Sequence, residues 1–202
     1  MLRVALTGNV ASGKSTVLEL FRHWGAAITD ADQFARQALA PGSAGLRHVR
    51  QRFGAGVFAA DGSLDRAALR HRITANPAER EALNAIVHPE VRRLSAEREA
   101  ELRQAGAPLV VHDIPLLFEV LNPSDYDVVV LVDAPAVVRR ERMMKNRGLS
   151  GTEADALIAA QAPSEAKRAR STFVLDNAGG RPDLEAAARV VWRELQRRAG
   201  AV

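Results

Sequence analysis

The sequence predicts an α/β fold built on a parallel β-sheet, and two observations support this prediction. Short apolar runs alternate along the chain with longer segments of helical periodicity. Residues 8–15 read Gly-Asn-Val-Ala-Ser-Gly-Lys-Ser, which fits the pattern G-x-x-x-x-G-K-S/T of a phosphate-binding loop, or P-loop. This loop connects a buried strand to a helix, so both observations indicate the same architecture.

The flanks of the motif provide that strand and that helix. Residues 2–7 are mostly apolar, which is typical of a short buried strand. Residues 15–24 place their apolar side chains on one helical face. Gly8 and Gly13 allow a tight turn, so that backbone N–H groups point toward an anion at the positive end of the helix dipole. The motif therefore predicts binding of a nucleoside triphosphate.

Single residues of the loop have distinct expected roles. Lys14 can reach the β- and γ-phosphates, and the Ser15 hydroxyl can hold Mg²⁺. The expected contacts to the triphosphate come from the loop and the first helical residues, namely Asn9, Val10, Ala11, Ser12, Gly13, Lys14, Ser15 and Thr16.

Length and composition limit the class of protein. A chain of 202 residues favours one domain with inserts, and 47% hydrophobic residues suffice for a sizeable core. The absence of cysteine excludes disulfides, thiolate catalysis and thiolate metal sites. No apolar run reaches about 18 residues, and the N-terminus lacks the pattern of a signal peptide. We therefore expect a cytoplasmic protein without a membrane partner.

The charge balance favours small anionic substrates over nucleic acid. The net charge is +4, and the basic residues form no concentrated run of the kind found in nucleic-acid-binding tails. Aromatic residues make up only 4% of the chain, which leaves few stacking platforms for single strands. We expect no nucleic-acid partner, and the oligomeric state stays open between a monomer and a weak homo-oligomer.

Two carboxylates follow the second expected strand, residues 26–29, and precede a helix expected over residues 33–40. Ligands of open α/β sheets bind at the carboxyl ends of the strands, where Asp30 and Asp32 lie. One of them could accept the proton of an attacking hydroxyl while the other lies near Mg²⁺. Alternatively, Asp32 caps the helix and Asp30 is a solvated turn residue. The sequence position leaves both interpretations open.

The middle of the chain is helical. We expect a helix over residues 45–53 and a helical pattern over residues 64–103, with breaks at Asn76-Pro77 and at His88-Pro89. This block is too long for a simple crossover between strands, so it predicts a helical insert. A single histidine at such a place is more typical of a helix junction than of a catalytic base.

The remaining elements complete the sheet. Three further strands are expected at residues 109–114, 126–132 and 172–175, and a last helix at 182–198. Asp113 ends the first of these strands and is either an acid near Mg²⁺ or a loop residue. An arginine-dense helix after residue 135 is either a solvated face or a mobile cover over a transferring phosphoryl group.

These motifs together resemble the dephospho-CoA kinase family over nearly the whole chain, and their order and spacing carry the resemblance. They are Leu6-Thr7-Gly8 with Ser12-Gly13-Lys14-Ser15, Asp30-Ala31-Asp32, Phe53-Gly54, Leu64 to Leu69, His88-Pro89, Pro115 to Glu119, Asp133, Arg142, Gln161, Lys167 to Arg170, and Asp176-Asn177.

The resemblance implies a P-loop NTPase fold of three layers with a five-stranded parallel sheet in the order 2-3-1-4-5. It implies one kinase domain, with a core at residues 1–59, 106–138 and 171–202, an acceptor-binding insert at about 60–105 and a lid at about 139–170. The implied reaction is ATP-dependent phosphorylation of the ribose 3′-hydroxyl of dephospho-CoA, the last step of coenzyme A biosynthesis. ATP is the implied co-substrate, together with Mg²⁺.

The resemblance also implies roles for single residues. Asp32 corresponds to the proposed base, while Lys14 and Arg142 would stabilise the charge of the transferred phosphoryl group. Asn177 lies in an adenine-contacting turn. The residues expected to bind dephospho-CoA are Asp32, Arg36, His88 and Leu116.

The chain departs from the family pattern at two places. Asn9 and Ala11 replace glycines of the usual loop, and Ala11 requires a backbone angle compatible with a β-carbon. Asn146 stands where the lid usually carries a second arginine, with Arg147 beside it, so either residue could serve there. Whether Asp30 or Asp113 contacts the metal sphere also stays open.

Three other functions compete with this interpretation. Another P-loop kinase acting on a nucleotide or nucleoside would share the core and the lid. A GTP-driven switch would need an Asn-Lys-x-Asp guanine motif, which the sequence lacks. A nucleic-acid-dependent ATPase would bind with steep salt dependence.

Overall fold

The computed structural model describes residues 1–200, which form two compact units. The first unit contains Met1–Thr29 and the chain from Leu102 onward, and the second contains Asp30–Glu101. The second unit begins well before the insert expected at about residues 60–105. The reason is that Leu39, Val49 and Phe53 already belong to its own hydrophobic core.

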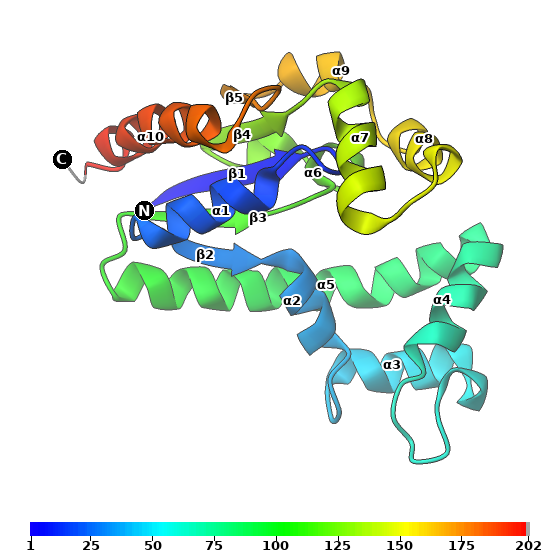
Figure 1. Cartoon of the computed structure of the whole chain (residues 1–202). Coiled ribbons are helices and arrows are strands. Elements are labelled where there is room, and N and C mark those ends of the chain that lie inside the picture. The colour runs from blue at the N-terminus through cyan, green and yellow to red at the C-terminus, as the bar shows by residue number, and fades with distance from the viewer. Residues whose placement is uncertain (201–202) are drawn as a thin grey trace. The chain divides into compact units, whose positions relative to one another are not determined.

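A five-stranded sheet forms the centre of the first unit (Figure 1). Its strand order, β2-β3-β1-β4-β5, confirms the expected one. The pairs β1–β3, β1–β4 and β4–β5 are parallel, with Leu6 opposite Asp113 and Gly8 opposite Val132. The strands are β1 (Leu2–Gly8), β2 (Ala27–Asp30), β3 (Leu109–Asp113), β4 (Val128–Asp133) and β5 (Phe173–Asp176).

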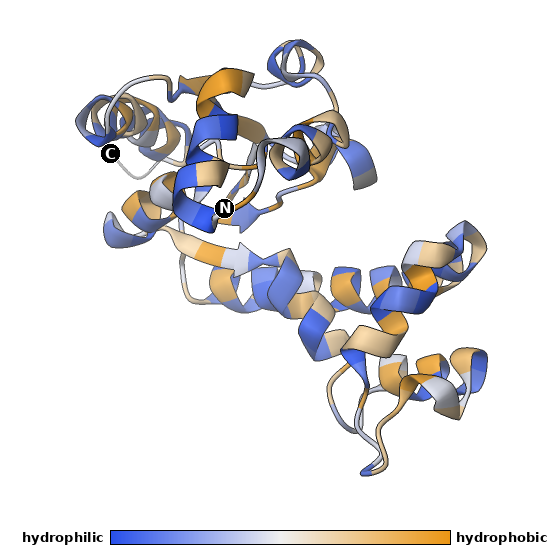
Figure 2. Ribbon diagram, turned by 45° about the vertical axis from the view of Figure 1, so that its right-hand side comes forward, coloured by the Kyte–Doolittle hydropathy of each residue, from blue (hydrophilic) through white to orange (hydrophobic). Residues whose placement is uncertain are grey.

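One face of the sheet is covered by α1 (Lys14–His23) and α10 (Arg181–Arg198), which lie side by side in Figure 1. Val4 and Leu6 of β1 pack into this layer, where the Phe21 and Trp192 ring centroids are 5.5 Å apart. Figure 2 shows hydrophobic and hydrophilic residues alternating along α10. This amphipathic pattern lets the helix bury one side against the sheet.

The opposite face of the central strands is also buried. Ala5 of β1 and Val129 of β4 pack there with Ile114 and with Leu117, the first residue of α6 (Leu117–Val120). Because successive strand residues point to opposite faces, β1 and β4 are apolar on both sides. The three layers of the predicted fold are thus present in the first unit.

The remaining helices of the first unit follow β4. They are α7 (Ala136–Arg147), α8 (Gly151–Ala159) and α9 (Ser164–Arg168), and a short 3₁₀ turn at Pro123–Asp125 precedes β4. Ser150 begins α8 with a capping box, because its hydroxyl accepts from Glu153 N while the Glu153 carboxylate accepts from Ser150 N. These helices occupy the segment expected to form the lid.

The second unit is helical. Its elements are α2 (Ala31–Ala38), α3 (Ala44–Phe53), a 3₁₀ turn at Ala55–Val57, α4 (Arg66–Ala75) and most of α5 (Pro77–Gln104). Buried side chains from these elements form one core, namely Leu39, Val49, Phe53, Val57, Leu69 and Leu83.

Two sequence expectations in this unit are wrong. The helical block breaks at Asn76, as expected, but it does not break at His88-Pro89, because Pro89 lies inside α5. Packing of Ile86 and Val87 against the core of the unit holds the preceding turn in helical form and overrides the local preference of a residue before proline.

The second error concerns the start of the helix after β2, which the sequence predicts at residue 33 while leaving open whether Asp32 caps it. Asp30, not Asp32, is the N-cap of α2, because its Oδ1 accepts from Gln33 N at 3.1 Å. The helix therefore starts two residues earlier than expected, and Asp32 lies in its first turn.

His112 on β3 is a buried titratable group within the sheet. Its side chain is only 4% exposed, and its Nδ1 lies 2.8 Å from the Thr29 hydroxyl. Burial, with a smaller contribution from the charge of Arg3, lowers the pKa of His112 from 6.5 to about 4. The folded protein therefore keeps this imidazole neutral at pH values where the unfolded chain binds a proton.

We predict that His112 makes folding sensitive to mild acid. Its contribution to stability is complete above pH 6.5 and is lost as the pH falls toward 4, since only the unfolded state gains the proton in that window. Between pH 7.5 and 4.5, urea unfolding should show that the parent loses about 2–3 kcal/mol more than a His112→Gln variant. Equal losses in parent and variant would contradict the assignment.

Candidate functional site: a phosphate-binding cleft in the first unit

The P-loop leaves β1 at Gly8 and enters α1 at Lys14. Gly13 is the residue before α1 and has a φ angle of 98°, a left-handed conformation that favours glycine. A β-carbon at Gly13 would collide with the side-chain amide of Asn177. Glycine at this position thus serves both the turn and the close approach of Asn177.

Ala11 also has a left-handed backbone, with a φ angle of 58°. No other residue of the described chain except glycine has a positive φ angle. This conformation costs an alanine about 1–2 kcal/mol, so neighbouring contacts must hold the loop in shape. The sequence requires an angle compatible with a β-carbon at Ala11, and the left-handed angle found there accommodates one only at this cost.

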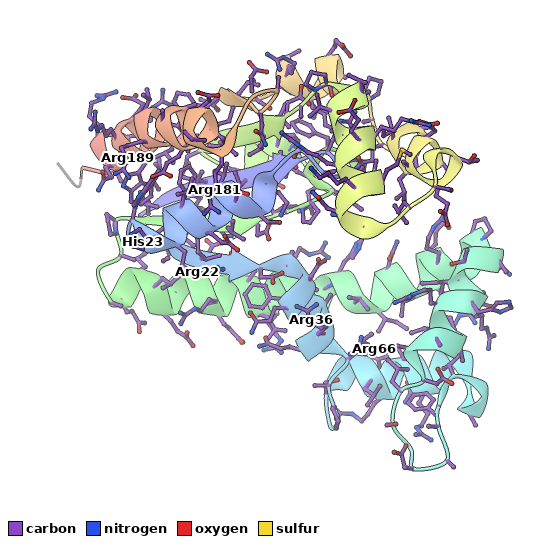
Figure 3. The ribbon with its side chains drawn as sticks, viewed as in Figure 1. Arg22, His23, Arg36, Arg66, Arg181 and Arg189 are labelled. Carbon is purple, nitrogen blue, oxygen red and sulfur yellow. The ribbon has the colours of Figure 1, made fainter. Side chains whose placement is uncertain are left out.

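The loop forms the floor of a cleft of about 640 Å³, a volume typical of small-molecule sites. Residues 9–16, Arg142 and Asn177 all line it, so the structure brings together every nucleotide-binding residue that the sequence predicted in this unit. Asn146 and Arg147, the two candidates for the role of the second lid arginine, both line the cleft. Arg181, labelled in Figure 3, begins α10 and lines it as well.

Lys14 is held in place by a carboxylate. Its ammonium donates to Asp113 Oδ1 at the end of β3, and both side chains are largely buried. Asp113 is therefore no simple loop residue, since it orients the lysine of the motif. The register of the sheet produces the pair, because Leu6, shortly before the loop, lies opposite Asp113.

Arg142 and Asn177 support the second half of the loop. Asn177 is 6% exposed, and its Nδ2 donates to Ser12 O at 2.7 Å. The Arg142 guanidinium donates to the backbone oxygen of Asn177 at 3.0 Å, to its Oδ1 at 3.3 Å and to Ala11 O at 3.5 Å. The helix α7 thus brings Arg142 directly to the phosphate-binding loop.

The first half of the loop is held by the segment from Gln161 to Lys167. Gln161 Oε1 accepts from Val10 N at 2.8 Å, and Ser164 Oγ accepts from Asn9 Nδ2 at 3.0 Å. Lys167 Nζ donates to Asn9 Oδ1 at 2.6 Å. The Asn9 side chain and the Val10 N–H group, both expected to contact the nucleotide, are thus engaged with other parts of the protein.

Sequence reasoning missed the role of Gln161, Ser164 and Lys167. They lie in a polar segment without a strong periodic pattern, and Pro163 interrupts it. The only sequence signal for their importance is that Gln161 and Lys167 belong to the motifs of the family resemblance.

Ion pairs fix the end of α9 on the sheet. Arg168 donates to Asp133 Oδ2 at 3.1 Å and to Asp176 Oδ1 at 2.6 Å. Asp176 and Asp133 raise the pKa of the Arg168 guanidinium, and Arg168 lowers the pKa of Asp176 in turn. Asp133 also accepts from Ser164 Oγ at 3.0 Å, so the ends of β4 and β5 position the residues that hold the loop.

The residues expected to bind the acceptor are spread over both units. Leu116 is 44% exposed and precedes α6 in the first unit. In the second unit, Asp32 and Arg36 lie on α2, and His88 is an exposed residue of α5. The Arg36 guanidinium lies 3.8 Å from Asp30 Oδ2, whereas the Asp32 carboxylate forms no hydrogen bond or ion pair within its own unit, residues 30–101.

Two kinds of feature are absent from the described residues. Residues 1–200 contain no group of three or more His, Cys, Asp or Glu side chains arranged to hold a metal ion. None of the helices described in that range has the length and hydropathy needed to cross a bilayer.

Comparison with known proteins agrees with the geometry of the cleft. A sequence model of the family described as dephospho-CoA kinase matches residues 2–183. The chain belongs to the dephospho-CoA kinase family. As a member of this family it is a kinase, and hence a transferase.

Individual relatives support the membership. A dephospho-CoA kinase of Anaeromyxobacter dehalogenans is 48% identical over 176 residues, which cover 87% of this chain and 83% of the relative. One of Thermobifida fusca is 40% identical over 198 residues, which cover 98% of both chains. The crystal structure of TT1252 from Thermus thermophilus is 42% identical, with a TM-score of 0.82 over 96% of this chain and 97% of that chain.

A more distant structure has the same fold. The dephospho-CoA kinase from Campylobacter jejuni has a TM-score of 0.74 over 97% of this chain and 98% of that chain. At 23% sequence identity, this similarity concerns the fold alone.

We predict that Gly13→Ala weakens nucleotide binding, because the new β-carbon would displace the Asn177 amide from Ser12 O. Isothermal titration with Mg-ADP should show at least about a tenfold loss of affinity, or more than about 1.4 kcal/mol.

Gly25→Ala provides the matched control. Gly25 has the same φ angle of 98°, but a β-carbon there would meet nothing within 4 Å. Both variants should lose about 1–2 kcal/mol of stability from the left-handed backbone. Only Gly13→Ala should lose affinity for Mg-ADP. Equal affinities of the two variants would refute the collision with Asn177.

Proposed function

We propose that the chain transfers the γ-phosphoryl group of ATP to the ribose 3′-hydroxyl of dephospho-CoA, giving coenzyme A and ADP as the last step of coenzyme A biosynthesis. The observation that carries this proposal is the cleft in which the P-loop, Lys14 and Arg142 converge, in a chain of the dephospho-CoA kinase family. The substrates are small molecules, and a cytoplasmic location, where ATP is abundant, is part of the proposal.

The nucleotide side of the reaction follows from the loop. The N–H groups of Ala11, Gly13, Lys14 and Ser15 would cradle the phosphates, while Lys14 would exchange Asp113 for the β- and γ-phosphates. Arg142 would stabilise the charge of the transferred group, since its guanidinium already lies at Ala11. Phosphoryl transfer needs mainly positioning and charge stabilisation, which these groups can supply.

The residues present fit a magnesium ion that arrives with ATP. Magnesium commonly uses one or two protein oxygens and substrate phosphates rather than a cage of protein ligands. The exposed Ser15 at the start of α1 would supply a hydroxyl, and Asp113 is the nearby carboxylate at the end of β3. The ion would neutralise charge on the phosphate oxygens.

The acceptor-binding residues are assigned from the family resemblance. We assign Asp32 as the group that orients the 3′-hydroxyl and accepts its proton, and its carboxylate is not consumed by capping α2, because Asp30 does that. Arg36, His88 and Leu116 are assigned to binding of dephospho-CoA. Movement of residues 139–170 over the nucleotide would exclude water and suppress hydrolysis of ATP.

A substrate panel tests the proposed reaction. We expect ADP release from Mg-ATP with dephospho-CoA, and little release with AMP, CMP, adenosine or DNA. Coenzyme A formation, followed by mass spectrometry, confirms the product. Turnover with a nucleotide or nucleoside but not with dephospho-CoA would replace the proposal with another P-loop kinase activity.

We predict that Asp32→Asn lowers kcat by about 10²–10⁴-fold, because the amide cannot accept the proton of the hydroxyl. Binding of ATP should change little. The matched control is Asp65→Asn, which makes the same change at the N-cap of α4, where asparagine caps equally well. A kcat of Asp32→Asn close to that of the parent would remove Asp32 from its proposed role.

A further inference from the structure

Lys167 is the most deeply buried charged side chain of the described residues. Only 1% of it is exposed, and its ammonium donates to Glu119 Oε1 and to Asn9 Oδ1, each at 2.6 Å. Glu119 belongs to α6, Asn9 to the P-loop and Lys167 to α9. One ammonium group therefore joins three segments that are far apart in the sequence.

A buried lysine is a poor way to gain stability. Removing its charge from water costs free energy that one carboxylate and one amide only partly return, and an apolar side chain of similar size often serves as well. What the ammonium supplies, and an apolar side chain cannot, is a directed hydrogen bond to Asn9. Lys167 is therefore suited to fixing the orientation of the Asn9 side chain.

The hydrogen bond from Lys167 is made to a residue of the phosphate-binding loop itself. Asn9 directly precedes Val10 and the strained Ala11, and its backbone oxygen accepts from Ser12 N at 3.1 Å. Ser164 holds the other end of the Asn9 amide at 3.0 Å, so the orientation of this side chain is defined on both sides. Displacement of Asn9 would shift the residues that follow it in the loop, which line the cleft.

We propose that Lys167 is a positioning residue of the nucleotide site, which acts through Asn9 to hold the phosphate-binding loop in its anion-ready conformation. Glu119 keeps the lysine in place without contacting the nucleotide. This inference rests on the proposed function, because it assumes that the cleft binds ATP. It assigns Lys167 no contact with the substrate.

The test is a double-mutant cycle read by Mg-ADP affinity. Lys167→Met should raise the dissociation constant by about 10–100-fold, the range expected when a hydrogen bond to a charged group is lost. In an Asn9→Ala background the same change should cost less than about threefold, because the intermediary is already absent. A purely structural lysine would lower Tm equally in both backgrounds and leave the affinity of the folded protein unchanged.

Two further variants keep the test decisive. Arg140→Met removes another ion-paired cation, which bonds to Asp155 at 2.9 Å, and should leave Mg-ADP affinity unchanged. If Lys167→Met does not fold, the pair Lys167→Met with Glu119→Gln removes both charges together and should show the same loss of affinity.

The outcomes separate this inference from the proposed function. If the parent does not bind Mg-ADP, the proposed nucleotide site is wrong. If the parent binds and the Lys167 variants bind within twofold of it, or if Lys167→Met costs the same with and without Asn9, the positioning role is wrong. In steady-state kinetics the loss should appear in kcat/KM for ATP, while KM for dephospho-CoA stays unchanged.

Discussion

The phosphate-binding loop can offer its N–H groups to an anion only if other segments hold its remaining polar groups. Ala11 sits in an unfavourable left-handed conformation, so the loop would not keep this shape alone. Asn177 and Arg142 bind its second half, and Gln161, with the residues after it, binds the first. The site is therefore a property of several distant segments, and the motif supplies only its inner surface.

The sheet explains why these segments meet. Parallel strands end at the same edge, so the loop after β1 lies beside the ends of β4 and β5. Asp133 and Asp176, the last residues of those strands, anchor Arg168 and with it the helix α9. Burial of both faces of β1 and β4 makes this edge rigid, which is what a site that works by positioning requires.

The sequence predicted what depends on local patterns. The strands, the P-loop and the strand order, the last through family resemblance, agree with the structure. Local rules failed where packing decides: Pro89 stays within a helix because neighbouring residues are buried. They left open whether Asp32 caps the helix after β2, and in the structure Asp30 does so. The place of Lys167 depends on contacts with residues 9 and 119, which no spacing rule connects.

The pair of Lys14 and Asp113 has a consequence for which anions the cleft accepts. Because the ammonium already has an internal counter-ion, a ligand must displace a carboxylate rather than neutralise a bare charge. A single weakly charged anion gains little from that exchange, whereas a polyphosphate that also engages the loop amides gains enough to drive it. The cleft would thus discriminate against the simple anions of the cell, because its own carboxylate acts as the competing ligand.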